Sequence, residues 1–326
     1  MKAYIKDIVS VLPSLKISNS QLEQEGCEWS DQQIISKIGV RFRNICDDNE
    51  SSLILGLRAA ESLLNRNLNL RKKIDYIFFS TLCHDHFMLN SAAFIQKKLN
   101  INDHCAAIDL KLGCSGYLTI LSLAKALICS KAANNVLIIT ADTYSKVISK
   151  NDFSCRSIFG DAATATIVSD TGIAEIGQCV SATDGEGSIN HAERIGLFSD
   201  SIISTEPSRD KSFFYMDGSE IFSFVANTIP KFYQRLLNEN GISNHSKNLT
   251  VFHQANKYML NYLRKVIGIP SDLFYNNMEY TGNTSTSSIP IALQEIIKED
   301  SNYDNIVCCS FGGGFCCSGT ILKIAK

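Results

Sequence analysis

The stretch that decides the fold is AAIDLKLGCSGYLTILSLAKALICSKAANNVLIIT, residues 106–140. Its apolar run ends at Gly113, and the segment from Cys114 to about Lys131 has the apolar spacing of a buried helix. A free cysteine often packs as a small hydrophobe, which is one explanation for Cys114. The N–H groups at a helix start favour a thiolate, which makes a nucleophile the other explanation. This stretch alone leaves both explanations open.

Short apolar runs alternate with helical patterns along the whole chain. The predicted strands cover residues 74–81, 105–110, 134–142, 162–170, 248–256 (running into a loop), 304–314 and 316–325. The predicted helices cover residues 90–100, 114–131, 218–240, 257–267 and the later part of 282–300. This alternation is typical of an α/β protein with a mostly parallel sheet. A boundary after residue 172 divides the chain into two similar halves, 1–172 and 173–326, with an irregular stretch at about 184–209.

Composition excludes several classes of protein. The chain has 326 residues, 45% of them apolar, and a formal net charge of −2 without a basic stripe, so a nucleic-acid partner is not expected. No apolar run is long enough for a membrane span, and MKAYIKDIVSVLPSLK lacks the features of a signal peptide. The twelve cysteines are not spaced like a disulfide framework. We expect a cytoplasmic protein with reduced thiols.

Three polar residues lie where predicted strands end. They are Cys114, His253 in FHQAN and Asn283 in TGNTSTS. Ligands usually bind at such strand ends, and Cys, His and Asn there indicate a nucleophile, a proton-handling group and a hydrogen-bond donor. Taken singly, His253 is typical of a loop histidine and Asn283 of a helix cap. The glycines of FGGGF (311–315) indicate a backbone N–H aimed into a site, a tight hairpin, or both, and not a phosphate-binding loop, because a strand rather than a helix follows them.

Two other groups of residues invite a metal interpretation. LCHDHFMLN (82–90) carries His84, Asp85 and His86, but no further ligand cluster lies near in sequence. The pairs Cys308–Cys309 and Cys316–Cys317 fall within predicted strands, where adjacent side chains point to opposite faces. We therefore predict no metal site and interpret the cysteine pairs as packing residues.

Together and in this order, these stretches resemble the thiolase-fold condensing enzymes, and specifically the β-ketoacyl-acyl-carrier-protein synthase III family. The resemblance implies a thiolase-like five-layered αβαβα fold built from two related halves, usually as a homodimer. The stretches that carry it are GVRFR (39–43), the Cys114 junction, IFGDAATA (158–165), YMDGSEIF (215–222), HQAN (253–256), GNTS (282–285) and FGGGF (311–315).

The resemblance also implies roles for individual residues. Cys114 would accept the acyl group, while His253 and Asn283 would promote decarboxylation of a malonyl thioester and hold the enolate. The backbone N–H groups of Cys114 and Gly313 would form the oxyanion hole. The implied partners are thioesters of acyl-carrier protein or coenzyme A, with no metal and no other cofactor. The expected substrate contacts are Phe87, Leu89, Phe153, Phe222, Asn256 and Lys257.

The chain departs from the family pattern near the site. Ala162 and Thr164 stand in GDAATA where the family has glycine. We expect their added side chains to narrow the space near the active site and so to affect the length of acyl chain that fits. The tryptophan and arginine that enclose the adenine of coenzyme A fall here on Gln33 and Phe153. Trp29 lies four residues before Gln33 and could take the tryptophan's place if its loop is shifted, but we expect it to be a buried anchor of that loop.

A further basic position of the family falls near Tyr258, next to Lys257. The adenine clamp is therefore not supported by the sequence. We predict that the acyl donor is held mainly by its pantetheine arm, on a carrier protein or on a loosely held coenzyme A.

Decarboxylative condensation in a specialised pathway is the leading interpretation. One alternative keeps the fold and Cys114 but transfers the acyl group to an oxygen, nitrogen or other non-malonyl acceptor. A papain-type cysteine hydrolase also orders Cys, His and Asn, but it leaves GDAATA and GGGF unexplained. A catalytically silent partner subunit would be expected to lack the cysteine or the histidine.

Overall fold

The computed structural model describes residues 1–85, 89–185, 213–242, 247–298 and 303–324. The strands are β1 (Tyr4–Val11), β2 (Leu15–Ser18), β3 (Phe42–Ile45), β4 (Tyr76–Ser80), β5 (Ala106–Leu110), β6 (Asn135–Asp142), β7 (Ala162–Ser169), β8 (Ala174–Ile176), β9 (Val180–Thr183), β10 (Asn248–Phe252), β11 (Phe274–Tyr275), β12 (Asn305–Gly312) and β13 (Cys316–Ile324).

The helices follow the predicted pattern, with shorter ones between. They are α1 (Asn19–Gln24), α2 (Asp31–Lys37), α3 (Ser52–Arg66), α4 (Ser91–Lys98), α5 (Gly116–Cys129), α6 (Phe153–Arg156), α8 (Gly218–Glu239), α9 (Lys257–Ile267) and α10 (Ser288–Lys298). Short 3₁₀ helices are η1 (Leu68–Lys73), η2 (Tyr144–Lys146), η3 (Ser271–Leu273), η4 (Met278–Tyr280) and η5 (Ser285–Ser287). Most of the predicted irregular stretch at 184–209 lies outside the described residues.

Eleven of the described strands form one continuous sheet in the order β11-β10-β12-β13-β8-β1-β7-β6-β4-β5, with β9 paired to β13. Each end has three parallel strands, β5-β4-β6 and β11-β10-β12, followed by an antiparallel neighbour, β7 or β13. The expectation of a mostly parallel sheet is wrong, because antiparallel pairs outnumber parallel ones. The physical reason is connection length: β12 and β13 are joined by a tight turn, which permits only antiparallel pairing.

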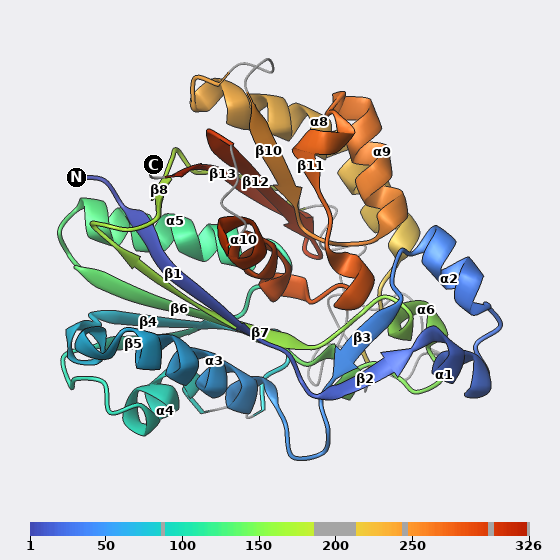
Figure 1. Ribbon diagram of the computed structural model, residues 1–326, viewed down its shortest axis with the longest axis horizontal. Helices are drawn as coiled ribbons and strands as arrows, with labels where there is room; N and C mark the ends of the chain where they lie inside the picture. Colours follow the sequence, from blue (N-terminus) through green and yellow to red (C-terminus); the bar gives the residue numbers. More distant parts are fainter. Residues whose placement is uncertain (86–88, 186–212, 243–246, 299–302, 325–326) are drawn as a thin grey trace.

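Five layers are visible in Figure 1: α3 and α4, the β1–β7 part of the sheet, α5 and α10, the β10–β13 part, and α8 with α9. The described residues form four hydrophobic clusters, and the three largest fill the spaces between the layers. The middle core joins residues of α5 and α10 to strands from both parts of the sheet, including Ile120, Leu293, Ile138 and Ile306. The predicted five-layered αβαβα architecture is confirmed. The shared strand order is consistent with two related halves, but a division after residue 172 stays a prediction.

The adjacent cysteines lie on opposite faces of the sheet, as predicted. Cys308 packs in the middle core, whereas Cys309 and Cys317 pack in the core beside α8. Burial raises the pKa of the Cys309 thiol well above its ordinary value, and that of Cys317 to about 12. These thiols are therefore packing groups.

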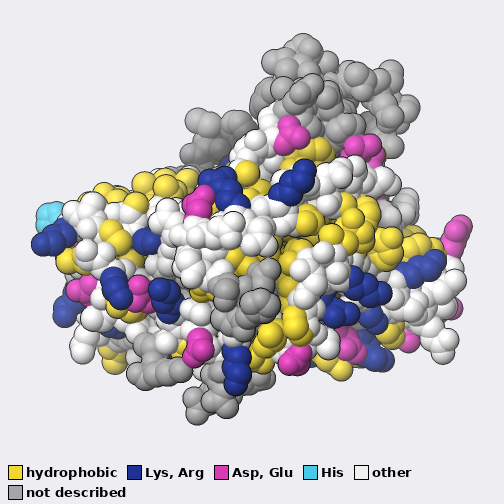
Figure 2. Space-filling view, turned by 90° about the horizontal axis from the view of Figure 1, so that it is seen from above, with side chains coloured by type: hydrophobic (Ala, Val, Ile, Leu, Met, Phe, Trp, Pro, Cys, Tyr) yellow, Lys and Arg dark blue, Asp and Glu magenta, His cyan; other side chains and the backbone are white. Residues whose placement is uncertain are grey.

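On the face shown in Figure 2, basic and acidic side chains are interspersed with hydrophobic ones. In the part of the chain that the structure describes, no helix has both the length and the hydropathy to cross a bilayer.

Candidate active site

Cys114 lies in the connection between β5 and α5. The helix begins at Gly116 rather than at Cys114, so the cysteine precedes the first helical residue by two positions. Its side chain is 8% exposed, and its Sγ lies 3.8 Å from Ser285 Oγ. A Cβ added to Gly312 would lie 2.6 Å from Cys114 Cβ and 3.2 Å from Sγ. The thiol therefore sits between α5, the end of β12 and the loop after Asn283.

The predicted tight hairpin at FGGGF is confirmed. β12 ends at Gly312, β13 starts at Cys316, and Gly314 turns the chain with φ of +77°. Gly312 gives the backbone its close approach to Cys114, because any side chain there would overlap the cysteine. Gly313 is the next residue in this turn, and its role in an oxyanion hole stays a prediction.

His253 directly follows β10 and is buried, with 2% of its surface exposed. Its backbone N–H donates to Cys309 O at 2.9 Å, which prolongs the pairing with β12. The ring packs edge-on against Phe311, and Nδ1 lies 2.7 Å from Ser288 Oγ. Burial lowers the pKa of His253 to about 3, so the imidazole is neutral at physiological pH.

Asn283 is held by its backbone and by its side chain. Its N–H donates to Ile158 O at 2.9 Å, and its carbonyl accepts from Gly160 N–H at 3.0 Å. The side-chain Oδ1 accepts from Ser285 N–H at 2.8 Å, which fixes the orientation of the amide and leaves Nδ2 on the other side. Ser285 makes this bond from a left-handed conformation (φ of +52°) that is uncommon for a residue other than glycine.

One short segment, residues 283–288, contains Asn283 and contacts both other predicted residues. Ser285 lies against the Cys114 thiol and holds Asn283, and Ser288 contacts the ring of His253. Sequence reasoning missed both serines, because Asn-Thr-Ser before a helix is typical of ordinary capping. The signal in the sequence was the run of five hydroxyl residues at 284–288, all of which are buried.

The hydroxyl run also explains one departure from the family pattern. Thr164, which stands where the family has glycine, bonds Thr140 Oγ1 at 2.7 Å. Thr140 in turn bonds Ser287 Oγ at 2.8 Å. The added hydroxyl of Thr164 therefore joins a polar chain that anchors the 283–288 segment on the sheet.

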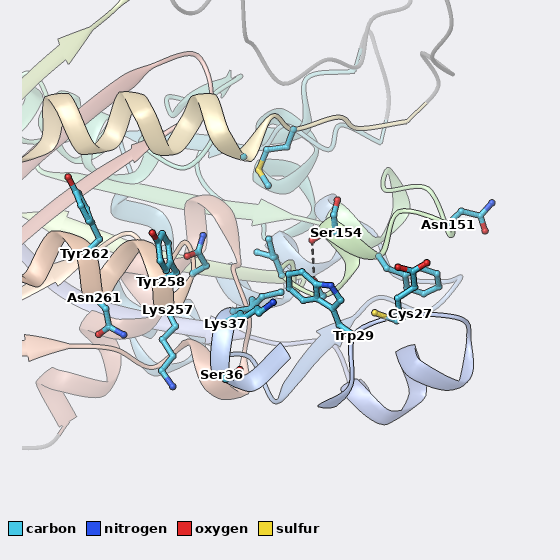
Figure 3. A pocket seen from close by; sticks show the side chains of 18 of the residues that line it. Cys27, Trp29, Ser36, Lys37, Asn151, Ser154, Lys257, Tyr258, Asn261 and Tyr262 are labelled. Carbon is cyan, nitrogen blue, oxygen red and sulfur yellow. Dashed lines mark hydrogen bonds between the residues drawn. The ribbon is translucent and has the colours of Figure 1, made fainter. Parts of the chain in front are cut away.

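The structure has a cavity of about 1170 Å³, and Figure 3 shows side chains that line it. Its lining includes Ile158, whose carbonyl holds Asn283, and Asn256, three residues after His253, but Cys114, His253 and Asn283 are not among the lining residues. Aromatic and basic side chains also line it, with Tyr258, Tyr262, Lys257 and Lys265 from α9 and with Trp29, Lys37 and Phe153 from the segments around α2 and α6. The cavity therefore adjoins the backbone that positions Asn283.

Trp29 was expected to be a buried anchor, and that expectation is wrong. Its side chain is 41% exposed and lines the cavity, with Lys37 Nζ 4.7 Å from the ring centroid. The reason is local: Ser30 and Gln33 form a capping box at the start of α2, which fixes the loop without burying the indole. The side chain of Gln33 is held in this cap, where its Oε1 accepts from Ser30 N–H at 2.9 Å.

The predicted substrate contacts fall into three groups. Phe153, Asn256 and Lys257 line the cavity. Phe222 is not among the lining residues, but its ring packs against Tyr258 and Tyr262, which are, with centroids 5.4 and 5.1 Å away. Leu89 is 41% exposed and does not line this cavity, and Phe87 lies outside the described residues.

Comparison with known proteins decides the family. The profile of 3-oxoacyl-[acyl-carrier-protein (ACP)] synthase III matches residues 108–185, and that of its C-terminal part matches residues 237–324. The chain is 33% identical over 320 residues to the β-ketoacyl-[acyl-carrier-protein] synthase III of Clostridium perfringens strain SM101, covering 96% of each chain. The chain belongs to the β-ketoacyl-acyl-carrier-protein synthase III family.

Other relatives of this family agree over the full length. The synthase III of Chlamydia caviae is 31% identical, covering 99% of this chain and 97% of its own. A crystal structure of a 3-oxoacyl-(acyl-carrier-protein) synthase III superposes with a TM-score of 0.91 at 34% identity, covering 99% of this chain and all of the other. The chain is therefore an acyltransferase of the condensing type. Neither transfer to an oxygen or nitrogen acceptor nor a papain-type hydrolase gains support from these comparisons.

Proposed function

We propose that Cys114 takes an acyl group from a thioester and passes it to the enolate of a malonyl thioester, giving a 3-oxoacyl thioester. The observation that carries this proposal is the 283–288 segment, which carries the carboxamide of Asn283 and contacts both the thiol and the imidazole. A neutral, buried imidazole suits the role, because it offers an N–H donor without a competing positive charge.

In the first half-reaction, the Cys114 thiolate attacks the donor carbonyl and the donor thiolate leaves. The negative charge on the tetrahedral oxygen is held by the backbone N–H groups of Cys114 and Gly313, each such donor typically contributing about 3–4 kcal/mol. The contact between Gly312 and Cys114 supports this assignment, because it keeps the hairpin backbone against the sulfur.

In the second half-reaction, the malonyl group loses CO₂ and leaves an enolate whose carbon attacks the acyl-Cys114 thioester. The Cys114 thiolate is expelled as the new carbon–carbon bond forms. His253 Nε2–H and Asn283 Nδ2–H donate to the enolate oxygen and stabilise its negative charge. Because this charge exists only at this step, the binding energy of the two contacts raises the rate.

We propose that the donor is an acyl-carrier protein or a loosely held coenzyme A, gripped mainly by its pantetheine arm. The cavity supports this, because most of the described side chains that line it are uncharged, and the charged ones among them are Glu28, Lys37, Lys257 and Lys265. A much higher kcat/KM with an acyl-coenzyme A than with the matching acyl-carrier protein would contradict the preference.

A homodimer and a cytoplasmic location complete the proposal. β5 is at one edge of the sheet with Ile108 38% exposed, and such an edge is a surface on which a second copy can pair. Sedimentation of wild type and Ile108→Lys tests the dimer. None of the twelve cysteines, all of them in the described part of the chain, is in a disulfide, which suits a reducing compartment.

Intact-mass analysis after exposure to a panel of acyl thioesters tests the function. Wild type should gain the mass of one acyl group, Cys114→Ala should gain none, and His253→Ala should keep the acyl group but fail to release CO₂ from a malonyl thioester. Acylation of Cys114→Ala, or C–C condensation by His253→Ala at the wild-type rate, would contradict the assignment.

A further inference from the structure

Ser288 makes a hydrogen-bond contact with the ring of His253. It is the first residue of α10, is 3% exposed, and places Oγ 2.7 Å from Nδ1 of the ring. In the described part of the chain, Nε2 of His253 makes no hydrogen bond, so Nδ1 alone ties the ring to the protein by a polar contact.

The direction of this hydrogen bond follows from the other partner of Ser288. Gln254 N–H points at Ser288 Oγ from 3.4 Å and, as a backbone amide, acts only as a donor. No other hydrogen bond of the Ser288 hydroxyl is found among the described residues, so its own hydrogen has Nδ1 as its acceptor. The reverse arrangement, with Nδ1–H donating, would leave a buried hydroxyl hydrogen without an acceptor, which is costly.

We infer that Ser288 is a positioning residue that holds His253 as the Nε2–H tautomer, ready to donate to the enolate oxygen in the condensation step. This inference rests on the proposed function. Ser285 does the equivalent for Asn283, because its backbone N–H occupies Oδ1 and leaves the amide N–H₂ to act as the donor. One buried turn thus sets the polarity of both enolate contacts.

The tautomer is measured directly by the ¹⁵N NMR signals of the His253 ring in wild type, assigned by their loss in His253→Asn. We expect a protonated Nε2 and a bare Nδ1. A protonated Nδ1 overturns the inference. This measurement needs no Ser288 variant, so it holds even if substitution at this position prevents folding.

The kinetic test separates the two half-reactions. Ser288→Ala should accept the acyl group on Cys114 within twofold of the wild-type rate, because that step does not use His253. Single-turnover condensation of the preformed acyl-enzyme with a malonyl thioester should slow by about tenfold, as expected for loss of one orienting hydrogen bond. Ser288→Thr keeps a hydroxyl and should restore most of the rate.

Thr250→Val is the matched control. It removes a buried hydroxyl from β10, but this hydroxyl bonds Tyr233 OH of α8 at 2.7 Å and contacts neither the imidazole nor the 283–288 segment. Equal slowing of condensation by Thr250→Val and Ser288→Ala, or wild-type condensation by Ser288→Ala, overturns the inference. Failure of wild type to become acylated would instead contradict the proposed function, and the NMR result would still test the tautomer.

Discussion

The substitution Gly312→Ala probes how tightly the thiol is held. The new Cβ would lie 2.6 Å from Cys114 Cβ, whereas carbon atoms in good contact are about 3.5 Å apart, so the two segments must separate by nearly 1 Å. A displacement of about 1 Å at a reacting group costs on the order of 100-fold in rate. We therefore expect acylation of Cys114 to slow about 100-fold and the free energy of unfolding to fall by about 1–3 kcal/mol.

The assay is the time course of acyl mass gain on Cys114 with a saturating donor, together with the thermal unfolding midpoint. Gly319→Ala in β13 is the control, because its Cβ would meet Leu236 Cδ2 of α8 at 2.7 Å and has no atom of Cys114 among its three nearest neighbours. It should lower the unfolding midpoint comparably but leave acylation within a few-fold of wild type. Wild-type acylation by Gly312→Ala would refute the reasoning, since it would mean that the thiol tolerates this shift.

Three further predictions concern other described contacts. Burial lowers the pKa of His253 from 6.5 to about 3, so in acid the unfolded chain binds a proton at this residue that the folded chain does not. The free energy of unfolding should therefore fall as the pH drops below 6.5, by up to about 1.4 kcal/mol per pH unit. Urea unfolding should show a flatter pH dependence in His253→Asn than in wild type. Trp29→Ala should raise KM for the acyl donor several-fold at unchanged kcat, while Lys37→Met should do less; equal KM for Trp29→Ala and wild type would exclude the indole from donor binding. Arg43→Lys should lower the free energy of unfolding by about 1.5–3 kcal/mol. Lysine cannot keep the buried hydrogen bond to Ser157 O at 2.9 Å together with the other contacts of the guanidinium. An unchanged urea midpoint would contradict this.

Local sequence signals predicted the elements well where periodicity and turn chemistry agree. The strand at 74–81 and the helix at 257–267 are present as β4 and α9, and the glycines at 312–314 form the expected hairpin. The start of α5 was predicted two residues early, because Cys114 and Ser115 fit the helical pattern but form the turn before it.

Long-range contacts were beyond sequence reasoning. Ser288 reads as a helix cap, and only the packing of α10 against the end of β10 brings it to His253. Trp29 was misjudged for a related reason: a large apolar side chain is usually buried, but here the capping box of α2 leaves it on a cavity wall. Such outcomes depend on where distant segments meet, which spacing along the chain does not encode.

The 283–288 segment also makes the active site a test of whole-chain assembly. Cys114 precedes α5, whereas His253 and the residues of the 283–288 segment lie more than 130 residues later in the chain. Two fragments cut between these regions would each carry part of the chemistry and should be inert when separate. Catalytic turnover that returns on mixing would then report reassociation of the fragments more sensitively than any optical signal.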